Sequence, residues 1–128
     1  MKHLTSFFAL AVCMLFSALL CGQTVFGPQQ IISNIANGAS SVFAADLDND
    51  GDWDAISASS SDGKIAWYEN DGTGIFGTQQ VITLNALGAS SVFAIDLNGD
   101  NNIDILSASS IDNKIAWYEN EGNGTFGE

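Results

Sequence analysis

The sequence has 128 residues and a formal net charge of −12, with 15 acidic residues against three basic ones. A surface of this charge repels nucleic acid and anionic membranes, so we expect neither as a partner. Because hydrophobic residues make up 46% of the chain, the acidity does not indicate disorder, and a folded core is predicted.

Residues 1–22 have the features of a secretory signal peptide. A lysine and a histidine precede an apolar run from Phe7 to Leu20, and small and polar residues follow it. The run is too short to span a bilayer, and no later stretch is apolar enough to do so. Cleavage after Gly22 would leave residues 23–128, so the sequence predicts a protein that is secreted or held at the cell surface.

The chain beyond this leader lacks most of the side chains that enzymes use. Both cysteines, Cys13 and Cys21, and the one histidine, His3, fall within the leader, and the sequence contains no arginine. No thiol nucleophile, imidazole base or thiolate zinc ligand remains, so we expect no enzymatic activity. A lipid anchor on Cys21 stays an alternative, although Leu20 is bulkier than the small residue that should precede an acylated cysteine.

A repeat of fifty residues follows the leader. Residues 26–75 and 76–125 align without a gap, and a third copy begins at Phe126 and Gly127. An internal repeat of this length is typical of propellers, solenoids and arrays of modules.

Each copy contains four β-type runs separated by turn residues. In the first copy the runs are SSVFAAD (40–46), WDAISAS (53–59), KIAWYEN (64–70) and IFGTQQVIT (75–83). The turns predict hairpins, and no stretch has helical periodicity. Apolar residues lie on both faces of these strands, as Val42 and Phe43 show, so each sheet should be covered on both faces. The sequence therefore predicts an all-β fold, with two four-stranded antiparallel blades of an incomplete β-propeller.

The ends of the repeats predict self-assembly. The segment VFGPQQIIS (25–33) matches the outermost run IFGTQQVIT (75–83), but no inner strands precede it. In the second copy the inner strands are followed only by TFGE, which leaves an outer edge open. Because two blades cannot close a ring, we expect either a longer protein or several copies that complete the propeller together.

Four features recur in register along the repeat. They are Phe-Gly pairs at 26–27, 76–77 and 126–127, Gly-Ala pairs at 38–39 and 88–89, aspartate-rich loops at 46–54 and 96–104, and acidic-Gly turns after each WYEN. Together they resemble the FG-GAP and VCBS repeat families, which are β-propeller repeats of integrin-type heads and of secreted bacterial proteins. The usual Gly-Ala-Pro of these families is Gly-Ala-Ser here, which is closer to the bacterial members.

The two aspartate-rich loops, DLDNDGDWD and DLNGDNNID, are the strongest candidate sites. Calcium takes six to eight oxygen ligands, and alternating carboxylates on a tight loop can wrap it. The resemblance implies side-chain ligands at the first, third, fifth and ninth loop positions and a backbone carbonyl at the seventh. In the first loop these are Asp46, Asp48, Asp50 and Asp54, with the carbonyl of Asp52.

In the second loop the same positions are Asp96, Asn98, Asp100 and Asp104, with the carbonyl of Asn102. Asn98 removes one charge relative to Asp48. Asn101 replaces Gly51, which adopts a positive φ more freely than asparagine does. We therefore expect the second calcium site to be weaker than the first.

Two other interpretations of the loops are disfavoured. An EF-hand requires flanking helices and a glutamate at the twelfth position, where Ser57 and Ser107 stand. A purely polar hairpin would leave like charges about 5 Å apart, which repel by roughly 0.8 kcal/mol per pair even in water. The arrangement therefore favours a bound cation.

The expected function is that of a secreted, calcium-binding module for binding or scaffolding, with cell-surface adhesion as one use. Its ligand would be an unidentified protein or glycan. One alternative is a non-catalytic accessory propeller of a larger secreted enzyme, and another is a carbohydrate-binding lectin. Trp67-Tyr68 and Trp117-Tyr118 could stack on sugars, but their recurrence in a buried strand favours a structural role, and Trp53 is the better candidate for an exposed contact.

Overall fold

The computed structural model describes residues 26–127, so the predicted leader of residues 1–22 lies outside the described part. The chain divides into two units, and the first contributes only residues 26–30 to the description, without secondary structure. The second unit begins at Ile31 and holds all the described strands. No helix within residues 26–127 has the length and hydropathy needed to cross a membrane.

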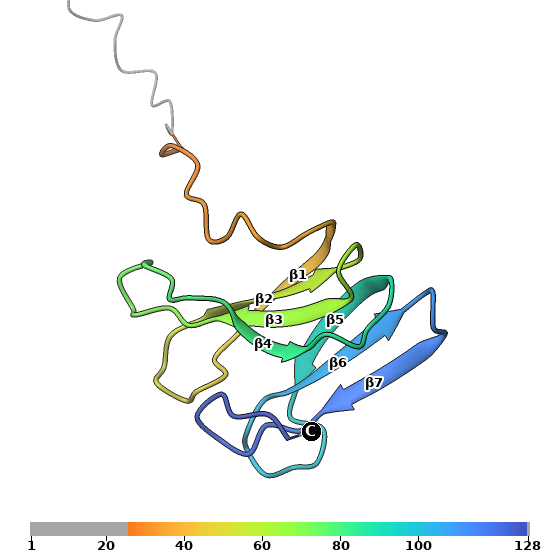
Figure 1. Ribbon diagram of the computed structural model, residues 1–128. Helices are drawn as coiled ribbons and strands as arrows, with labels where there is room; N and C mark the ends of the chain where they lie inside the picture. The colour runs from red at the N-terminus through yellow and green to blue at the C-terminus, as the bar shows by residue number, and fades with distance from the viewer. Residues whose placement is uncertain (1–25, 128) are drawn as a thin grey trace, which may run out of the picture. The chain divides into compact units, whose positions relative to one another are not determined.

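The strands form two antiparallel sheets (Figure 1). The first sheet has the order β1-β2-β3-β4 and the second the order β5-β6-β7. The bounds are β1 (Ala39–Ala45), β2 (Asp54–Ser59), β3 (Lys64–Tyr68), β4 (Gln80–Thr83), β5 (Ala89–Ile95), β6 (Asp104–Ser109) and β7 (Lys114–Tyr118). In each sheet the spatial order follows the chain, as expected for strands joined by hairpins.

The first sheet is the predicted four-stranded meander, and the all-β prediction is correct. The second sheet differs, because within the described residues it has three strands rather than four. Its predicted fourth run contributes only an isolated bridge between Asn120 and Phe126. The equivalent bridge in the first sheet, between Asn70 and Phe76, precedes the regular strand β4.

The core lies between the two sheets. Ile56 is opposite Trp67 in the register of β2 and β3, so these side chains share one face of the first sheet. They pack in one buried cluster with Val92 of β5 and Ile105 of β6. The cluster therefore joins one face of the first sheet to one face of the second.

The expectation that both faces of each sheet are covered is met by β2 and β3 of the first sheet, and the second sheet departs from it within the described residues. Strand β3 is buried along its whole length, whereas the identical sequence in β7 is largely exposed. Val42 of β1 is also exposed. The second sheet packs on the first through the face that carries Val92 and Ile105, so the face of β7 that carries Ile115 and Trp117 has no described sheet against it.

A polar contact joins the sheets beside the first aspartate-rich loop. The side-chain amide Nδ2 of Asn120 donates to the carbonyl of Leu47 at 2.8 Å, and the backbone N–H of Gly124 donates to the same oxygen at 3.0 Å. Gly124 has a φ of +67° and lies against Trp67, where any Cβ would collide with the indole ring. We call this contact, formed by Leu47, Asn120 and Gly124, the Leu47 clasp.

Candidate metal centre

Each aspartate-rich loop joins the first two strands of its sheet. The first loop runs from Asp46 to Trp53 between β1 and β2, and it is closed by the pairing of Ala45 with Asp54. The second loop has the same place between β5 and β6. Both loops therefore occupy equivalent turns of two consecutive sheets.

Two left-handed residues shape each loop. In the first loop Asn49 has a φ of 64° and Gly51 a φ of 97°, and in the second Gly99 has 85° and Asn101 has 72°. Glycine and asparagine are the residues that adopt this region most readily. Each loop thus carries one asparagine and one glycine with a positive φ, in opposite order. The sequence analysis noted that Asn101 replaces Gly51, but it did not note that Gly99 replaces Asn49 and so compensates for that change.

Backbone amides of the first loop hold three carboxylates in place. The N–H groups of Gly51, Asp50 and Asp52 donate to Asp46 at 3.1 Å, Asp48 at 3.2 Å and Asp50 at 2.9 Å. One carboxylate oxygen from each of Asp46, Asp48 and Asp50 lies within 4.8 Å of the others. Three hard oxygens at this separation suit a cation such as calcium.

Two further observations fit a cation at this triad. Oδ1 of Asp46 is buried and has no hydrogen-bond partner among the described residues. Burial raises the pKa of Asp48 above its ordinary value, and the charges of Asp54, Asp50 and Asp46 add to that effect. A cation would give the buried oxygen a partner and would offset the repulsion between the carboxylates.

The other two predicted residues of the first loop are placed differently. The carboxylate of Asp52 lies beside Gly72, at the position where a Cβ of that residue would be. Both oxygens of Asp54 accept backbone N–H groups, from Leu47 at 2.9 Å and from Asn70 at 2.9 Å. Asp54 is buried, and burial raises its pKa despite these two bonds. Asp54 thus ties the loop to the turn after β3, and each of its oxygens keeps a second lone pair.

The second loop does not gather three carboxylates. The side-chain amide of Asn98 donates to Asp100 at 3.1 Å and to Glu119 at 2.9 Å, so a hydrogen-bond donor stands where the first loop has a carboxylate. Asp96 accepts the N–H groups of Gly99 at 2.7 Å and Asn101 at 3.0 Å. The N–H of Asn102 and the amide of Asn98 hold the pKa of Asp100 below its ordinary value.

Asp104 repeats the role of Asp54, because its oxygens accept the N–H groups of Leu97 at 3.1 Å and Asn120 at 2.8 Å. Oδ1 of Asn102 accepts a bond from Nδ2 of Asn49 at 3.1 Å, which links the second loop to the first.

Glu119 contacts the second loop, and the sequence analysis did not predict this contact. The hairpin register could have indicated it, because Ile105 pairs with Tyr118, which places the next residue, Glu119, beside Asp104.

Comparison with known proteins finds one family, which matches the chain twice. The sequence model of a family described as FG-GAP-like repeat matches residues 46–107 and, separately, residues 96–128. The two matches begin at the first aspartate of the first and of the second loop. No curated protein and no solved structure matches the chain.

Proposed function

Because the chain belongs to the FG-GAP-like repeat family, we propose that it is a secreted, calcium-binding module of a β-propeller that serves binding or scaffolding. The observation that carries this proposal is the triad of Asp46, Asp48 and Asp50, with its buried and unpartnered Oδ1 of Asp46. The secreted location is supported by the predicted leader of residues 1–22.

In the first loop, calcium would be held by the triad, with the carbonyl of Asp52 and the carboxylate of Asp54 as the remaining protein ligands. The ion would offset the burial and the charge repulsion that raise the pKa of Asp48, and it would fix the turn between β1 and β2. In the second loop the ligands would be Asp96, Asn98, Asp100 and Asp104, with the carbonyl of Asn102. That site would be weaker, because the amide of Asn98 already occupies an oxygen of Asp100.

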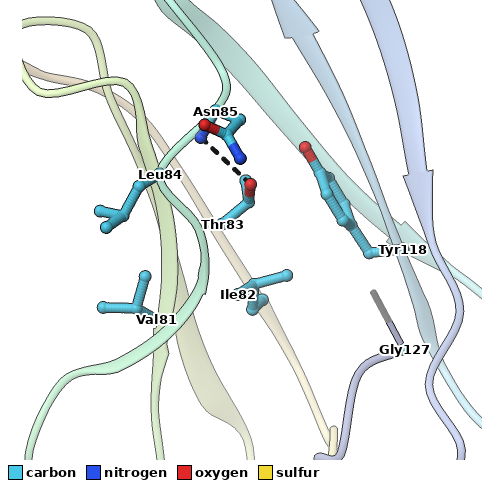
Figure 2. A pocket seen from close by; sticks show the side chains of 7 residues that line it. All are labelled: Val81, Ile82, Thr83, Leu84, Asn85, Tyr118 and Gly127. Carbon is cyan, nitrogen blue, oxygen red and sulfur yellow. Dashed lines mark hydrogen bonds between the residues drawn. The ribbon is translucent and has the colours of Figure 1, made fainter.

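A non-catalytic role is supported by the lining of one pocket and by the burial of one aromatic pair. A pocket of about 520 Å³ lies along β4 and is lined by Val81, Ile82, Thr83, Leu84, Asn85, Tyr118 and Gly127 (Figure 2). Tyr118 is the one titratable side chain in that lining, so the pocket offers no pair of nucleophile and base. Trp67 and Tyr68 are buried, which removes them as a platform for sugar rings, whereas Trp117 of the second pair is 46% exposed.

The test of calcium binding is thermal unfolding in calcium and in chelator. Extracellular calcium sites bind at about 10⁻⁴ to 10⁻³ M. At ten times the dissociation constant, each occupied site adds about 1.4 kcal/mol to the free energy of unfolding. The unsubstituted chain should therefore melt at a higher temperature in millimolar calcium, and Asp50→Asn, which removes one carboxylate of the triad, should lose most of that increase.

Glu121→Gln is the matched control, since it removes one charge outside both loops, and it should keep the full calcium effect. An unfolding temperature that is the same in calcium and in chelator would show that these loops do not bind the ion.

A further inference from the structure

Three Asn-Gly steps occur in the chain, at residues 37–38, 98–99 and 123–124. At such a step the backbone nitrogen of the glycine can attack the side-chain amide of the asparagine, because no Cβ stands in the way. The attack closes a succinimide ring and releases ammonia. The second step lies within the second aspartate-rich loop, where Asn98 occupies the third position.

The three glycines differ in the space around them. A Cβ at Gly99 would meet no atom within 4 Å, whereas Gly38 and Gly124 are each packed against a side chain with which a Cβ would collide. Asn98 is exposed, as is Gly99. The peptide group between these two residues is therefore the least crowded of the three, and the side chain of Asn98 has room to fold back onto it.

A carboxylate holds the nucleophilic nitrogen of this step. The backbone N–H of Gly99 donates to Oδ1 of Asp96 at 2.7 Å. A general base has to lie about 2.6 to 3.2 Å from the atom whose proton it removes, and Asp96 meets this requirement. The N–H of Gly124 donates instead to the carbonyl of Leu47, which is too weak a base to remove a proton.

The side-chain amide that would be attacked is also held in one orientation. Oδ1 of Asn98 accepts the backbone N–H of Asp100 at 3.0 Å. Negative charge develops on this oxygen when a nitrogen attacks Cγ, so the N–H of Asp100 is placed to stabilise it. Nδ2 is the leaving group, and it donates to Oδ2 of Asp100 at 3.1 Å and to Glu119 at 2.9 Å.

We propose that Asn98 is a site of self-catalysed deamidation, in which the backbone nitrogen of Gly99 displaces the side-chain amide. Asp96 takes the proton of the Gly99 nitrogen, the bond from that nitrogen to Cγ forms, and the bond from Cγ to Nδ2 breaks. The proton passes through solvent to Nδ2, which leaves as ammonia. Water then opens the succinimide, and no other reagent is consumed.

Water can open the ring at either of its two carbonyl groups. Attack at Cγ gives aspartate at position 98, and attack at the backbone carbonyl gives isoaspartate. The N–H of Asp100 donates to the oxygen on Cγ, so it favours attack at Cγ and the formation of aspartate. The net reaction converts one amide and one water into one carboxylate and one ammonium ion.

The product has the ligand pattern of the first loop. Aspartate at position 98 corresponds to Asp48, and it lacks the donor that Asn98 presents to Asp100 and Glu119. The carboxylates would then repel one another, and a bound cation would offset that repulsion. The calcium affinity of the second loop should therefore rise. This consequence rests on the proposed calcium binding, whereas the deamidation itself does not.

The test is peptide mapping of the secreted chain after prolonged incubation at neutral pH. Trypsin cleaves after Lys64 and Lys114, so the three steps fall in three different peptides, and mass spectrometry detects the replacement of NH₂ by OH in each. In the folded chain Asn98 should react at least about tenfold faster than Asn37 or Asn123, since general-base assistance contributes about 10²- to 10⁴-fold. In urea, where the loop is unfolded, the three rates should become similar.

Asp96→Asn tests the role of the base. The amide oxygen of the new side chain can still accept the N–H of Gly99 but cannot take its proton, so the rate at Asn98 should fall at least about tenfold. Glu121→Gln, which lies outside both loops, is the control and should leave that rate unchanged. A rate at Asn98 that does not exceed those of the other two steps, or that Asp96→Asn leaves unchanged, would overturn the proposal.

Calorimetric titration of Asn98→Asp separates the modification from the proposed calcium function. The second loop of this variant should bind calcium at least about tenfold more tightly than that of the unsubstituted chain, because an added carboxylate attracts the divalent ion. Deamidation without calcium binding in either chain would refute the calcium function and leave the modification site established. Isoaspartate as the main product would overturn the predicted gain of a ligand.

Discussion

Replacement of Asn120 by alanine should destabilise the fold far more than replacement of its sequence counterpart Asn70. Asn120 is fully buried, and its side chain makes three hydrogen bonds. It donates to the carbonyls of Leu47 at 2.8 Å and Ile103 at 3.0 Å, and it accepts the N–H of Gly122 at 3.0 Å.

Asn70 makes the local bonds of the same turn but lacks the bond to a neighbouring sheet. Its side chain donates to the carbonyl of Trp53 at 3.1 Å and accepts the N–H of Gly74 at 3.1 Å, and both bonds are exposed. Water can replace exposed bonds, so Asn70→Ala should cost about 1 kcal/mol or less.

The magnitude follows from the burial of the Asn120 bonds. Each lost bond contributes about 1 kcal/mol, so Asn120→Ala should lower the free energy of unfolding by about 3 kcal/mol. The N–H of Gly124 still satisfies the carbonyl of Leu47, which prevents a larger loss. The difference of about 2 kcal/mol between the two variants corresponds to roughly 10 °C in Tm for a domain of this size.

The assay is thermal and urea unfolding of both variants in saturating calcium. Asn120→Asp is a useful third variant, because it keeps the size of the side chain and removes the donor to Leu47. Equal unfolding free energies for the Asn120 and Asn70 variants would refute the assignment of the Leu47 clasp as the main polar contact between the sheets.

Two further predictions use paired positions of the repeats. Trp67→Ala should lower the free energy of unfolding by about 3 to 5 kcal/mol and Trp117→Ala by about 1 kcal/mol or less, because one indole is buried and the other is half exposed. Urea unfolding measures both changes, and similar values would contradict the account. As the pH falls toward the ordinary carboxyl value of 3.8, the calcium affinity of the first loop should begin to decrease at a higher pH than that of the second, since the pKa of Asp48 is raised and that of Asp100 is lowered. Titrations at several pH values, with each loop inactivated in turn, check this order, and a decrease in affinity that begins at a higher pH in the second loop would contradict it. Without calcium, the pH has the opposite effect at Asp48. The contribution of Asp48 to the free energy of unfolding is fully present below pH 3.8, and it is lost as the pH rises through the higher pKa of the folded state.

The sequence predicted the local elements of the fold well, because hairpins depend on turn residues and on short strands close in the chain. The inner strands fall within one or two residues of the predicted runs, and β4 is the later part of the run 75–83. The exposure of β7 could not be predicted from its strand sequence, which is identical to that of β3. What differs is the neighbouring sheet, and that is a property of tertiary packing.

The same limit applies to the metal centre. Alternating carboxylates predicted a cluster, and Asp46, Asp48 and Asp50 do lie together. The spacing did not distinguish Asp54, whose oxygens accept two backbone N–H groups from segments far apart in sequence. It also missed Glu119, because a contact with the second loop depends on hairpin register rather than on the loop itself.

The most direct test of the central claim, that these loops bind calcium, is calorimetric titration of the chain with calcium. Two sites of unequal affinity are predicted, with the tighter one lost in Asp50→Ala and the weaker one lost in Asp100→Ala. A titration without binding heat, together with an unfolding temperature unaffected by calcium, would contradict the account. Loss of the tighter site in Asp100→Ala would reverse the order of the loops.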